Sequence, residues 1–450
     1  MILEQADPII QEPIGVLGYG VEGISTCNYL LQRGFTDITV LDRKRPSNLD
    51  PRLKFGEGYV NGIATLRTLF RSAGVRPDLP EIAEFIRKGG TLTSQTGLAF
   101  SLAGHDRIIG VTGTLGKGTC CSLLSAMLTE AGIPAALGGN IGIPALDLAS
   151  SLPLGEKLIL ELSSFQLSTL PKSPRFAAVL KTTSEHLDWH LHRDEYWLHK
   201  SNLVATQTAE DTLTYCADTE GSAWIASKSK GKKIPFGENS DIFISGSEVT
   251  FSKWGFSLPL SATRLTGEFN LENLAAAGVL ALELGAKPNH VLAAAAAFNG
   301  LEHRLEFVRE LEGVSFYNDS YATRPDATIG AIAALAKTPL GLILGGSDKQ
   351  ADFSGLTKQI ASASHVKAIA LIGQTAEKLQ SELQRVGFLS SLSLSGRSLK
   401  KSDSLEEAVE FLRSQVKTGC IALSPACASF GMFENYKERG KSFKRLIAGL

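Results

Sequence analysis

Short apolar runs alternate with amphipathic segments along the chain, and this alternation predicts parallel strands connected by helices. At 108–111 an apolar run leads into a glycine-rich turn, and the next segment places Leu123, Leu124, Met127 and Leu128 at helical spacing. An uninterrupted apolar run is typical of a strand that is buried on both faces. We expect strands, mostly apolar, at 14–17, 38–41, 108–111, 157–162, 176–181, 314–317, 340–344, 366–372 and 420–423.

One region departs from this alternation. Residues 209–265 are rich in Thr, Ser, Lys and Gly, and their apolar residues alternate over short runs at 242–244 and 249–251. This pattern predicts antiparallel hairpins without a site of their own.

The turn at 110–119 reads Gly-Val-Thr-Gly-Thr-Leu-Gly-Lys-Gly-Thr. A strand, a glycine loop, a lysine and a helix in this order form a cradle in which backbone N–H groups and Lys117 bind phosphates. The alternative is an ordinary strand-to-helix turn. Gly118 stands where a magnesium-binding hydroxyl is expected, so Thr119 or water has to supply it.

A second glycine turn, G-x-G-x-x-G at 18–23, follows the first strand, and Asp42 ends the next strand. This spacing fits a nucleotide site in which Asp42 accepts a ribose hydroxyl, and a UDP group suits a unit of this length. A tight turn without a ligand is the alternative.

Polar residues end two strands of the central region. Glu161 is a candidate magnesium ligand at the carboxyl edge of the sheet, or else a strand-end glutamate that caps the next helix. His186 is a candidate ligand at the same edge, or else a buried histidine. His190 and His192 are expected at the surface, and the pattern alone predicts that Lys200 is solvated.

The last third of the chain repeats the strand–helix alternation, and its strands end in polar loops that carry Lys349, Ser424 and Ser429, which we expect to be exposed. Before it, Asn273 lies near the start of an alanine-rich helix, where it either caps the helix or bonds a purine edge.

The length and motifs together predict an α/β protein of three domains, because 450 residues exceed one hydrophobic core. We expect a Rossmann-like N-terminal domain at 1–98, a central P-loop ATPase-like domain at 99–304 and a C-terminal doubly wound Rossmann-like domain at 305–450.

The net charge and the spacing of the cysteines argue against some classes of function. A net charge of −1 argues against a nucleic-acid or membrane surface, and no long apolar run or leader pattern is visible, so a cytoplasmic location is expected. Six scattered cysteines lack metal spacing, and the pair Cys120-Cys121 is expected to fill the core. A triphosphate site, a magnesium carboxylate and a second nucleotide pocket together indicate phosphoryl transfer from ATP.

Motifs in this order resemble the Mur ligase family over nearly the whole chain. They lie at 112–117, 138–142, 161–167 (Glu-Leu-Ser-Ser-Phe-Gln-Leu), 184–188, 270–273, 303–304, 318–320 and 423–429.

The resemblance implies ATP-dependent amide formation. The carboxylate of UDP-N-acetylmuramoyl-L-alanine takes the γ-phosphoryl group, the amine of D-glutamate attacks the acyl phosphate, and phosphate leaves, in peptidoglycan precursor synthesis. It further implies two Mg²⁺ ions, a carbamylated Lys200 and a monomer.

The resemblance also assigns roles to residues. For catalysis it points to Lys117, Glu161, His186 and Lys200. For metal binding it points to Glu161, His186 and Lys200, and Thr119 joins them as the residue that replaces the hydroxyl missing at Gly118. For ATP it points to Gly113, Thr114, Gly116, Lys117, Gly118, Thr119, Asn273, Arg304 and Asp319. For the UDP substrate it points to Gly20, Val21, Glu22, Asp42, Arg43, Gly74, Asn140, Ser163 and Gln166, and for the amino acid to Thr323, Lys349, Ser429 and Tyr436.

Two departures lie near the amino-acid residues: Tyr321 and Arg324 replace a more usual lysine and asparagine. The L-glutamate-adding relative is therefore an alternative. Others are a folylpolyglutamate synthase-like ligase, a nucleotide-binding module without catalysis, and an NAD-dependent oxidoreductase, which would need neither Lys117 nor Glu161.

Overall fold

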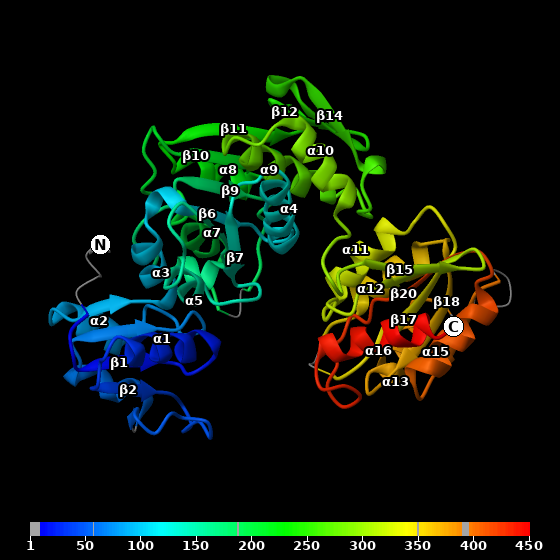
Figure 1. Cartoon of the computed structure of the whole chain (residues 1–450). Helices are drawn as coiled ribbons and strands as arrows, with labels where there is room; N and C mark the ends of the chain where they lie inside the picture. The colour runs from blue at the N-terminus through cyan, green and yellow to red at the C-terminus, as the bar shows by residue number, and fades with distance from the viewer. Residues whose placement is uncertain (1–9, 57, 187–188, 349–350, 389–395) are drawn as a thin grey trace. The chain divides into compact units, whose positions relative to one another are not determined.

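The computed structural model describes residues 10–56, 58–186, 189–348, 351–388 and 396–450. They form two compact units, one from the described residues up to Thr263 together with 271–297, and one from 264–270 together with 298–450. Within these residues there are three sheets, the first two in unit 1 and the third in unit 2 (Figure 1). The predicted α/β class is confirmed. The domain boundaries at 98 and 304 stay predictions.

The first sheet is wholly parallel, in the order β3-β2-β1-β4-β5. Its first two strands have the predicted bounds, because their residues are buried apart from Thr39, which is partly exposed. Its elements are β1 (Ile14–Leu17), α1 (Val21–Gln32), β2 (Ile38–Leu41), β3 (Lys54–Gly56), η1 (Tyr59–Thr65), β4 (Thr68–Arg71), α2 (Pro80–Arg87) and β5 (Thr91–Thr93).

The second sheet runs β14-β13-β12-β11-β10-β9-β6-β8-β7. It begins after α3 (Gln95–Ala103) and η2 (His105–Arg107). Its strands are β6 (Ile108–Thr112), β7 (Ala135–Gly139), β8 (Lys157–Glu161), β9 (Phe176–Val179), β10 (Thr212–Cys216), β11 (Lys232–Gly237), β12 (Ile242–Ser245), β13 (Glu248–Phe251) and β14 (Phe256–Pro259). Its helices are α4 (Lys117–Glu130), α5 (Ala145–Ala149), α6 (Ser164–Leu167), α7 (Arg193–Ser201), α8 (Glu220–Ser227), η3 (Ser252–Trp254), η4 (Leu260–Ala262), α9 (Asn270–Glu283) and α10 (Pro288–Ala297).

The prediction of hairpins at 209–265 is only partly right. β10 and β11 pair in parallel, and helix α8 connects them. The antiparallel pairs are confined to β12, β13 and β14. The unit β10–α8–β11 was not recognised from the sequence, because both of its strands are short and contain polar residues.

The third sheet has the order β15-β16-β20-β17-β18-β19, and only β15 is antiparallel to its neighbour. The predicted doubly wound arrangement is confirmed. Its elements are β15 (Glu306–Leu311), β16 (Val314–Asn318), α11 (Pro325–Ala334), β17 (Leu340–Gly345), α12 (Ser354–Ser362), β18 (Val366–Ile372), α13 (Ala376–Arg385), β19 (Ser398–Lys401), α15 (Leu405–Gln415), β20 (Gly419–Leu423) and α16 (Tyr436–Ala448).

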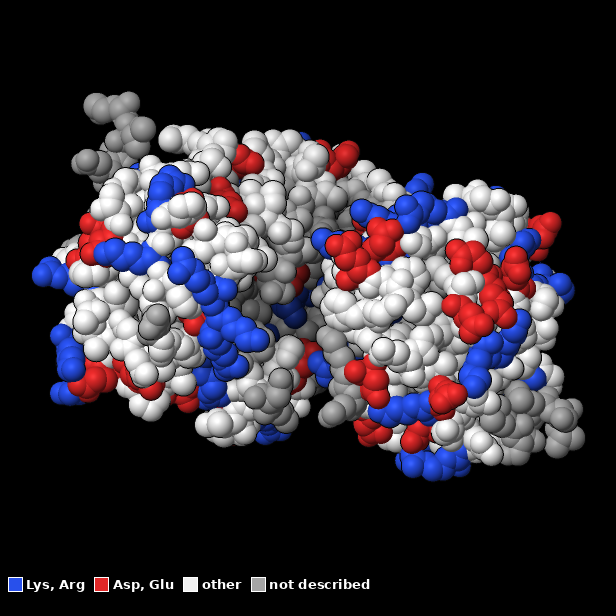
Figure 2. Space-filling view, turned by 90° about the horizontal axis from the view of Figure 1, so that it is seen from below, with Lys and Arg blue, Asp and Glu red and all other residues white. Residues whose placement is uncertain are grey.

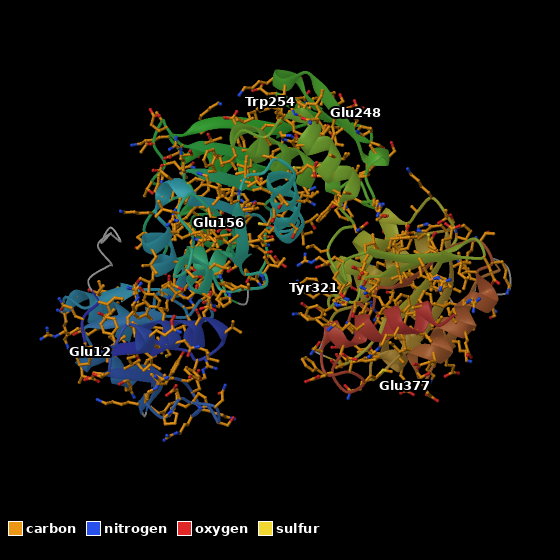
Figure 3. The ribbon with its side chains drawn as sticks, viewed as in Figure 1. Glu12, Glu156, Glu248, Trp254, Tyr321 and Glu377 are labelled. Carbon is orange, nitrogen blue, oxygen red and sulfur yellow. The ribbon has the colours of Figure 1, made fainter. Side chains whose placement is uncertain are left out.

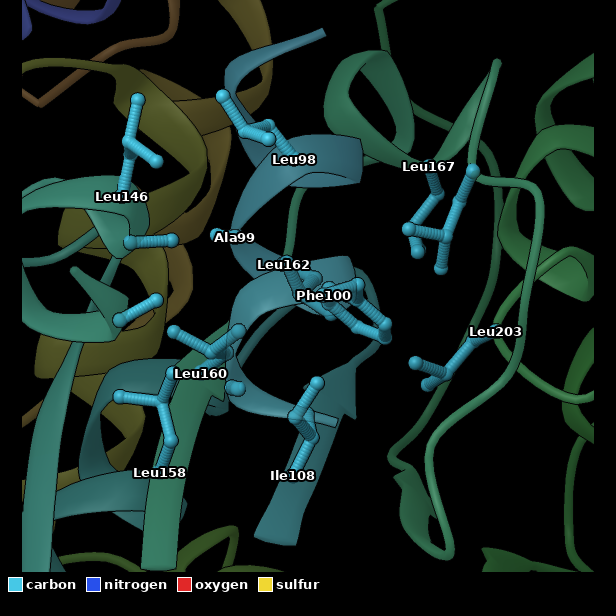
Figure 4. Packing of buried hydrophobic residues seen from close by; sticks show 14 of the residues in the cluster. Leu98, Ala99, Phe100, Ile108, Leu146, Leu158, Leu160, Leu162, Leu167 and Leu203 are labelled. Atoms are coloured by element: carbon cyan, nitrogen blue, oxygen red, sulfur yellow. The ribbon is translucent and has the colours of Figure 1, made fainter. Parts of the chain in front are cut away.

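One hydrophobic core serves both sheets of unit 1. Figure 4 shows Leu98, Ala99 and Phe100 of α3 in the same cluster as Leu160 of β8 and Leu162, which follows that strand. The predicted boundary at residue 98 falls inside this helix. The six cysteines are buried thiols, and the prediction that Cys120 and Cys121 fill the core is confirmed.

Side chains of both charge signs are scattered among uncharged residues on the face that Figure 2 shows. On the face in Figure 2, Lys and Arg are interspersed with Asp and Glu on both units. Within the described residues, no helix combines the length and the apolar composition that a membrane span requires.

Replacing Leu160 by Ala should lower the free energy of unfolding of unit 1 by about 2–5 kcal/mol, because this side chain is fully buried in the shared core. Urea unfolding followed by tryptophan fluorescence measures it, since all four tryptophans lie in unit 1. The control is Leu154→Ala at a fully exposed leucine, which should leave the midpoint unchanged. Equal midpoints for the two variants would contradict the assigned core.

Candidate functional site

The glycine loop after β6 has the geometry that its sequence predicts. β6 ends at Thr112, α4 begins at Lys117, and Gly116 has a positive φ of 86°. A Cβ atom at Gly116 would lie 2.3 Å from the side-chain oxygen of Asn273. Glycine is therefore required here both by the backbone conformation and by the close approach of α9. Since Asn273 lies inside α9, it is not the N-cap of that helix.

Lys117 lies over this loop. Its Nζ atom donates to the backbone carbonyls of Gly113, at 3.1 Å, and Thr114, at 2.9 Å. The hydroxyl of Thr114 lies 3.1 Å from that of Tyr196 and accepts from the N–H of Thr183. The loop is thus held by bonds from α7 and from the segment after β9.

The two residues after Lys117 are the glycine that lacks the expected magnesium-binding hydroxyl and a threonine that carries one. Gly118 is buried in the first turn of α4, and Thr119 beside it is partly exposed. Thr119 therefore carries the hydroxyl that follows the loop.

Lys200 is buried, so the prediction of a solvated lysine is wrong. Its Nζ atom donates to the carbonyl of Gly113 at 2.9 Å and to the hydroxyl of Thr112 at 3.2 Å. Burial lowers the pKa of Lys200 well below its usual range, and repulsion by Lys117 adds to this. The neutral amine is therefore favoured relative to an exposed lysine. Helical spacing did not reveal this, because α7 turns Lys200 toward the loop rather than toward solvent.

Glu161 ends β8 with one satisfied and one unsatisfied carboxylate oxygen. Its Oε1 atom accepts from the amide of Asn140 at 2.8 Å, whereas its buried Oε2 atom has no hydrogen-bond partner. A buried carboxylate oxygen without a donor is costly, and a cation beside it would remove that cost. Glu161 does not cap the next helix, because Ser163 and Gln166 form the capping box of α6.

His186 has a positive φ of 57° and a side chain that is 39% exposed, so the alternative of a buried histidine is wrong. Its ring lies 4.9 Å from that of Phe165. Among the residues that the structure describes, no three His, Cys, Asp or Glu side chains form a cluster that could hold a metal alone. The donor set fits a magnesium ion that takes its remaining ligands from phosphate and water, as this ion commonly does.

His190 corrects another prediction. It is fully buried, and its two ring nitrogens lie 3.0 Å from the hydroxyl of Ser164 and 3.2 Å from Nδ1 of His199. Burial lowers the pKa of His190 to about 4. His192 is exposed, as predicted, and caps the start of α7.

A cavity of about 700 Å³ in unit 1 brings together all nine residues that were predicted for a UDP-linked substrate. The first sheet contributes its strand-end loops, and the second sheet contributes the loop after β7 and helix α6. The predicted lining residues are Gly20, Val21, Glu22, Asp42, Arg43, Gly74, Asn140, Ser163 and Gln166.

Two carboxylates in the cavity wall accept hydrogen bonds from neighbouring segments. Glu22 accepts from the side-chain amide of Gln166 at 2.7 Å and from the N–H of Ala73 at 3.0 Å. Asp42 accepts from the N–H groups of Tyr19 and Arg43. Asp42 therefore fixes the glycine turn that precedes α1.

Several lining residues were not predicted. Tyr19 lies within the G-x-G-x-x-G turn and Phe165 within the motif at 161–167, so both positions were marked by sequence. Tyr59 lies in a short helical turn that carries no recognisable signal.

In unit 2, Asp319 is buried at the end of β16. It accepts from the hydroxyl of Ser424 at 2.6 Å and from the N–H of Leu305 at 3.0 Å. Burial raises the pKa of Asp319 to about 7, although both hydrogen bonds favour the charged carboxylate. The parallel pairing of β16 with β20 places these two strand ends side by side.

Beside Asp319, aromatic and cationic groups form a row. The guanidinium of Arg304 lies 3.9 Å from the ring centre of Tyr321, which is in edge-to-face contact with Tyr436 at 5.1 Å. Figure 3 labels Tyr321 on this unit. Thr323 donates its N–H to the carbonyl of Tyr321.

The predicted exposure of Ser424 and Ser429 is wrong, because both are buried. Ser429 follows the loop after β20, whose segment around Ala428 pairs with Ser347, so the loops at this edge cover one another. Lys349 lies outside the described residues.

Comparisons with known proteins agree with these motifs. The family profile of the Mur ligase middle domain matches residues 111–281, and the profile described as "Mur ligase, glutamate ligase domain" matches 303–427. The chain is 33% identical over 461 residues to the UDP-N-acetylmuramoylalanine--D-glutamate ligase of Symbiobacterium thermophilum, covering 98% of this chain and 99% of that protein. The protein with the same name from Acetivibrio thermocellus is 35% identical over 462 residues, with 98% and 97% covered.

Among solved structures, the MurF ligase of Thermotoga maritima in complex with ADP shares the fold, with a TM-score of 0.60 at 18% identity and with 100% and 97% of the two chains covered. The profiles cover more than half of the chain, and the relatives cover nearly all of it. The chain therefore belongs to the Mur ligase family.

Proposed function

We propose that this protein is an ATP-dependent ligase that adds D-glutamate to UDP-N-acetylmuramoyl-L-alanine in peptidoglycan precursor synthesis, and that it acts as a cytoplasmic monomer. Relatives of that name, 33% and 35% identical over 98% of the chain, support the reaction. The observation that carries the proposal is the cavity lined by all nine substrate residues in the same unit as the lysine-bearing glycine loop.

The reaction needs two steps that conserve atoms and charge. A carboxylate oxygen of the precursor attacks the γ-phosphorus of ATP, the bond to ADP breaks, and an acyl phosphate forms. The amine of glutamate then attacks the acyl carbon, loses a proton, and displaces inorganic phosphate. Both steps bring anions together, so their rate depends on fixed positive groups.

The glycine loop is proposed to bind the triphosphate. N–H groups of the loop and of the start of α4 would hold the β- and γ-phosphates, and Lys117 would exchange its two carbonyl partners for phosphate oxygens. The N–H of Thr114 donates to the carbonyl of Lys181, so the other N–H groups of the loop are the proposed phosphate donors. Of the remaining ATP residues, Asn273 would contact adenine, and Arg304 and Asp319 would contact the γ-phosphate and ribose.

Thr119, Glu161, His186 and Lys200 are proposed to hold two magnesium ions. The unsatisfied Oε2 atom of Glu161 supports this role. The ions would neutralise phosphate charge when bound. Addition of carbon dioxide to the amine of Lys200, with loss of a proton, would give a carbamate, which adds carboxylate-like oxygens to that of Glu161.

The amino acid is proposed to bind in unit 2 through Thr323, Lys349, Ser429 and Tyr436. Tyr321 belongs to the same aromatic row as Tyr436, so this departure lies where the acceptor is expected to bind. The relatives' name supports D-glutamate rather than the L-glutamate of the alternative.

The direct test is phosphate release from ATP in the presence of UDP-N-acetylmuramoyl-L-alanine and either glutamate enantiomer. We expect release that requires both the precursor and D-glutamate, with product identity checked by mass spectrometry. Release that occurs with L-glutamate but not with D-glutamate, each in the presence of the precursor, would reverse the stereochemical assignment. If neither enantiomer causes phosphate release, the ligase assignment would be overturned, and the alternative of a nucleotide-binding module without catalysis would be favoured.

Lys117→Ala should abolish turnover, a loss of at least about a thousandfold, because the γ-phosphoryl charge loses its nearest cation. Initial rates at saturating ATP and precursor measure it, and circular dichroism checks that the fold is retained. The control is Lys172→Ala, at an exposed lysine. A Lys117→Ala variant that keeps most of its kcat would contradict the phosphate role.

Lys200→Ala should be inactive, and a small carboxylic acid such as acetate should restore part of the rate by replacing the missing carbamate. The rate is measured against acetate concentration. Lys117→Ala serves as the comparison, since a carboxylate cannot replace its ammonium. Equal responses of the two variants to acetate, or none in Lys200→Ala, would count against carbamylation.

A further inference from the structure

Arg71 is a buried arginine at the end of strand β4. Only 1% of it is exposed, and among the described residues no carboxylate lies within ion-pair distance of its guanidinium. Its sequence context, Thr-Leu-Phe-Arg, is a buried strand, in which an arginine is unexpected. Burying a guanidinium is costly unless its donors are satisfied, so its partners identify what the residue does.

The two terminal nitrogens of Arg71 bind two different segments. Nη1 donates to the carbonyls of Ser72 and Ala73, each at 3.3 Å, and to that of Val75. These three carbonyls belong to the loop that follows β4. A single nitrogen therefore fixes the path of the loop at 72–75.

Nη2 donates to the end of helix α6 and the turn after it. Its acceptors are the carbonyl of Phe165 at 3.1 Å, the hydroxyl of Ser168 at 2.8 Å and the hydroxyl of Thr169 at 3.0 Å. Since the guanidinium is planar and rigid, it sets the distance between this helix and the loop at 72–75.

Both segments line the cavity, whereas Arg71 does not. The loop contributes Ser72, Ala73, Gly74 and Val75, and α6 and its N-cap contribute Ser163, Phe165 and Gln166. Glu22, which does line the cavity, joins the same two segments through its bonds to Ala73 and Gln166. The two segments are thus connected once at the cavity wall and once behind it.

We propose that Arg71 is a positioning residue for the substrate cavity, which holds the loop at 72–75 and helix α6 at the separation that the uridine-linked precursor requires. This role rests on the proposed function. Lysine cannot replace the arginine, because one ammonium group cannot reach both sets of acceptors. Burial lowers the pKa of Arg71 to about 10, so the guanidinium remains charged at neutral pH.

The test compares Arg71→Lys and Arg71→Met with the wild type by calorimetric binding of UDP-N-acetylmuramoyl-L-alanine and of a non-hydrolysable ATP analogue. We expect about tenfold weaker binding of the precursor and analogue affinity within about twofold. In steady-state kinetics, KM for the precursor should rise while kcat at saturation changes little, because the lost contact acts on binding rather than on the reacting atoms.

Two further variants separate positioning from general destabilisation. Leu69→Val alters the same strand in the core without touching the guanidinium, and it should leave both affinities unchanged. Ser168→Ala removes one of the acceptors that Nη2 of Arg71 binds after helix α6, and it should weaken precursor binding by about threefold. Ser168→Ala also keeps the test valid if the Arg71 variants do not fold.

Hydrogen exchange of the ligand-free protein gives a readout that is independent of activity. Arg71→Lys should increase exchange at 72–75 and at 163–169 together, with strand β8 unchanged. Wild-type precursor affinity in Arg71→Lys, or an equal loss of both ligands, would overturn the role of Arg71. A wild-type protein that binds no precursor would overturn the proposed function itself.

Discussion

The carbonyl of Gly113 accepts from two lysine side chains, Lys117 from the following helix and Lys200 from α7. Two amines at one backbone oxygen oppose each other electrostatically, and burial adds to the cost for Lys200. Such an arrangement is stabilised when an anion reaches the loop. The loop backbone, α4 and α7 are joined through this one oxygen, and the nearby carboxylate of Glu161 partly offsets the cost of charge on Lys200.

The order of the strands in the parallel sheets positions these polar groups. β6 lies between β8 and β9, so the loops that follow these three strands meet at one edge. The same principle places Asp319 next to Ser424 in unit 2, because β16 and β20 are neighbours. In each case a polar side chain at a strand end is brought to a partner far away in sequence by strand order alone.

In unit 1 the two sheets are packed into one compact unit, because a shared core and side-chain hydrogen bonds connect them. The core around α3 is continuous, Ser25 of α1 donates to Asp147 of α5, and Arg71 and Glu22 join the first sheet to α6. The substrate cavity lies where these connections converge. Its shape is therefore a property of both sheets, and neither would form it alone.

The sequence by itself determined the apolar strands, such as β1, β6 and β17, and the glycine loop, because apolar runs and glycine spacing express local requirements of burial and backbone conformation. The order of its motifs indicated the family, whereas polar strands such as β10 and β11 were not recognised. Through motif resemblance the sequence also named nine of the nineteen residues that line the cavity. Only the tertiary structure decided that Lys200, His190, Ser424 and Arg71 are buried. Their exposure depends on which surface each helix or loop packs against, and that choice is made by strand order and by contacts between segments that lie far apart in the chain.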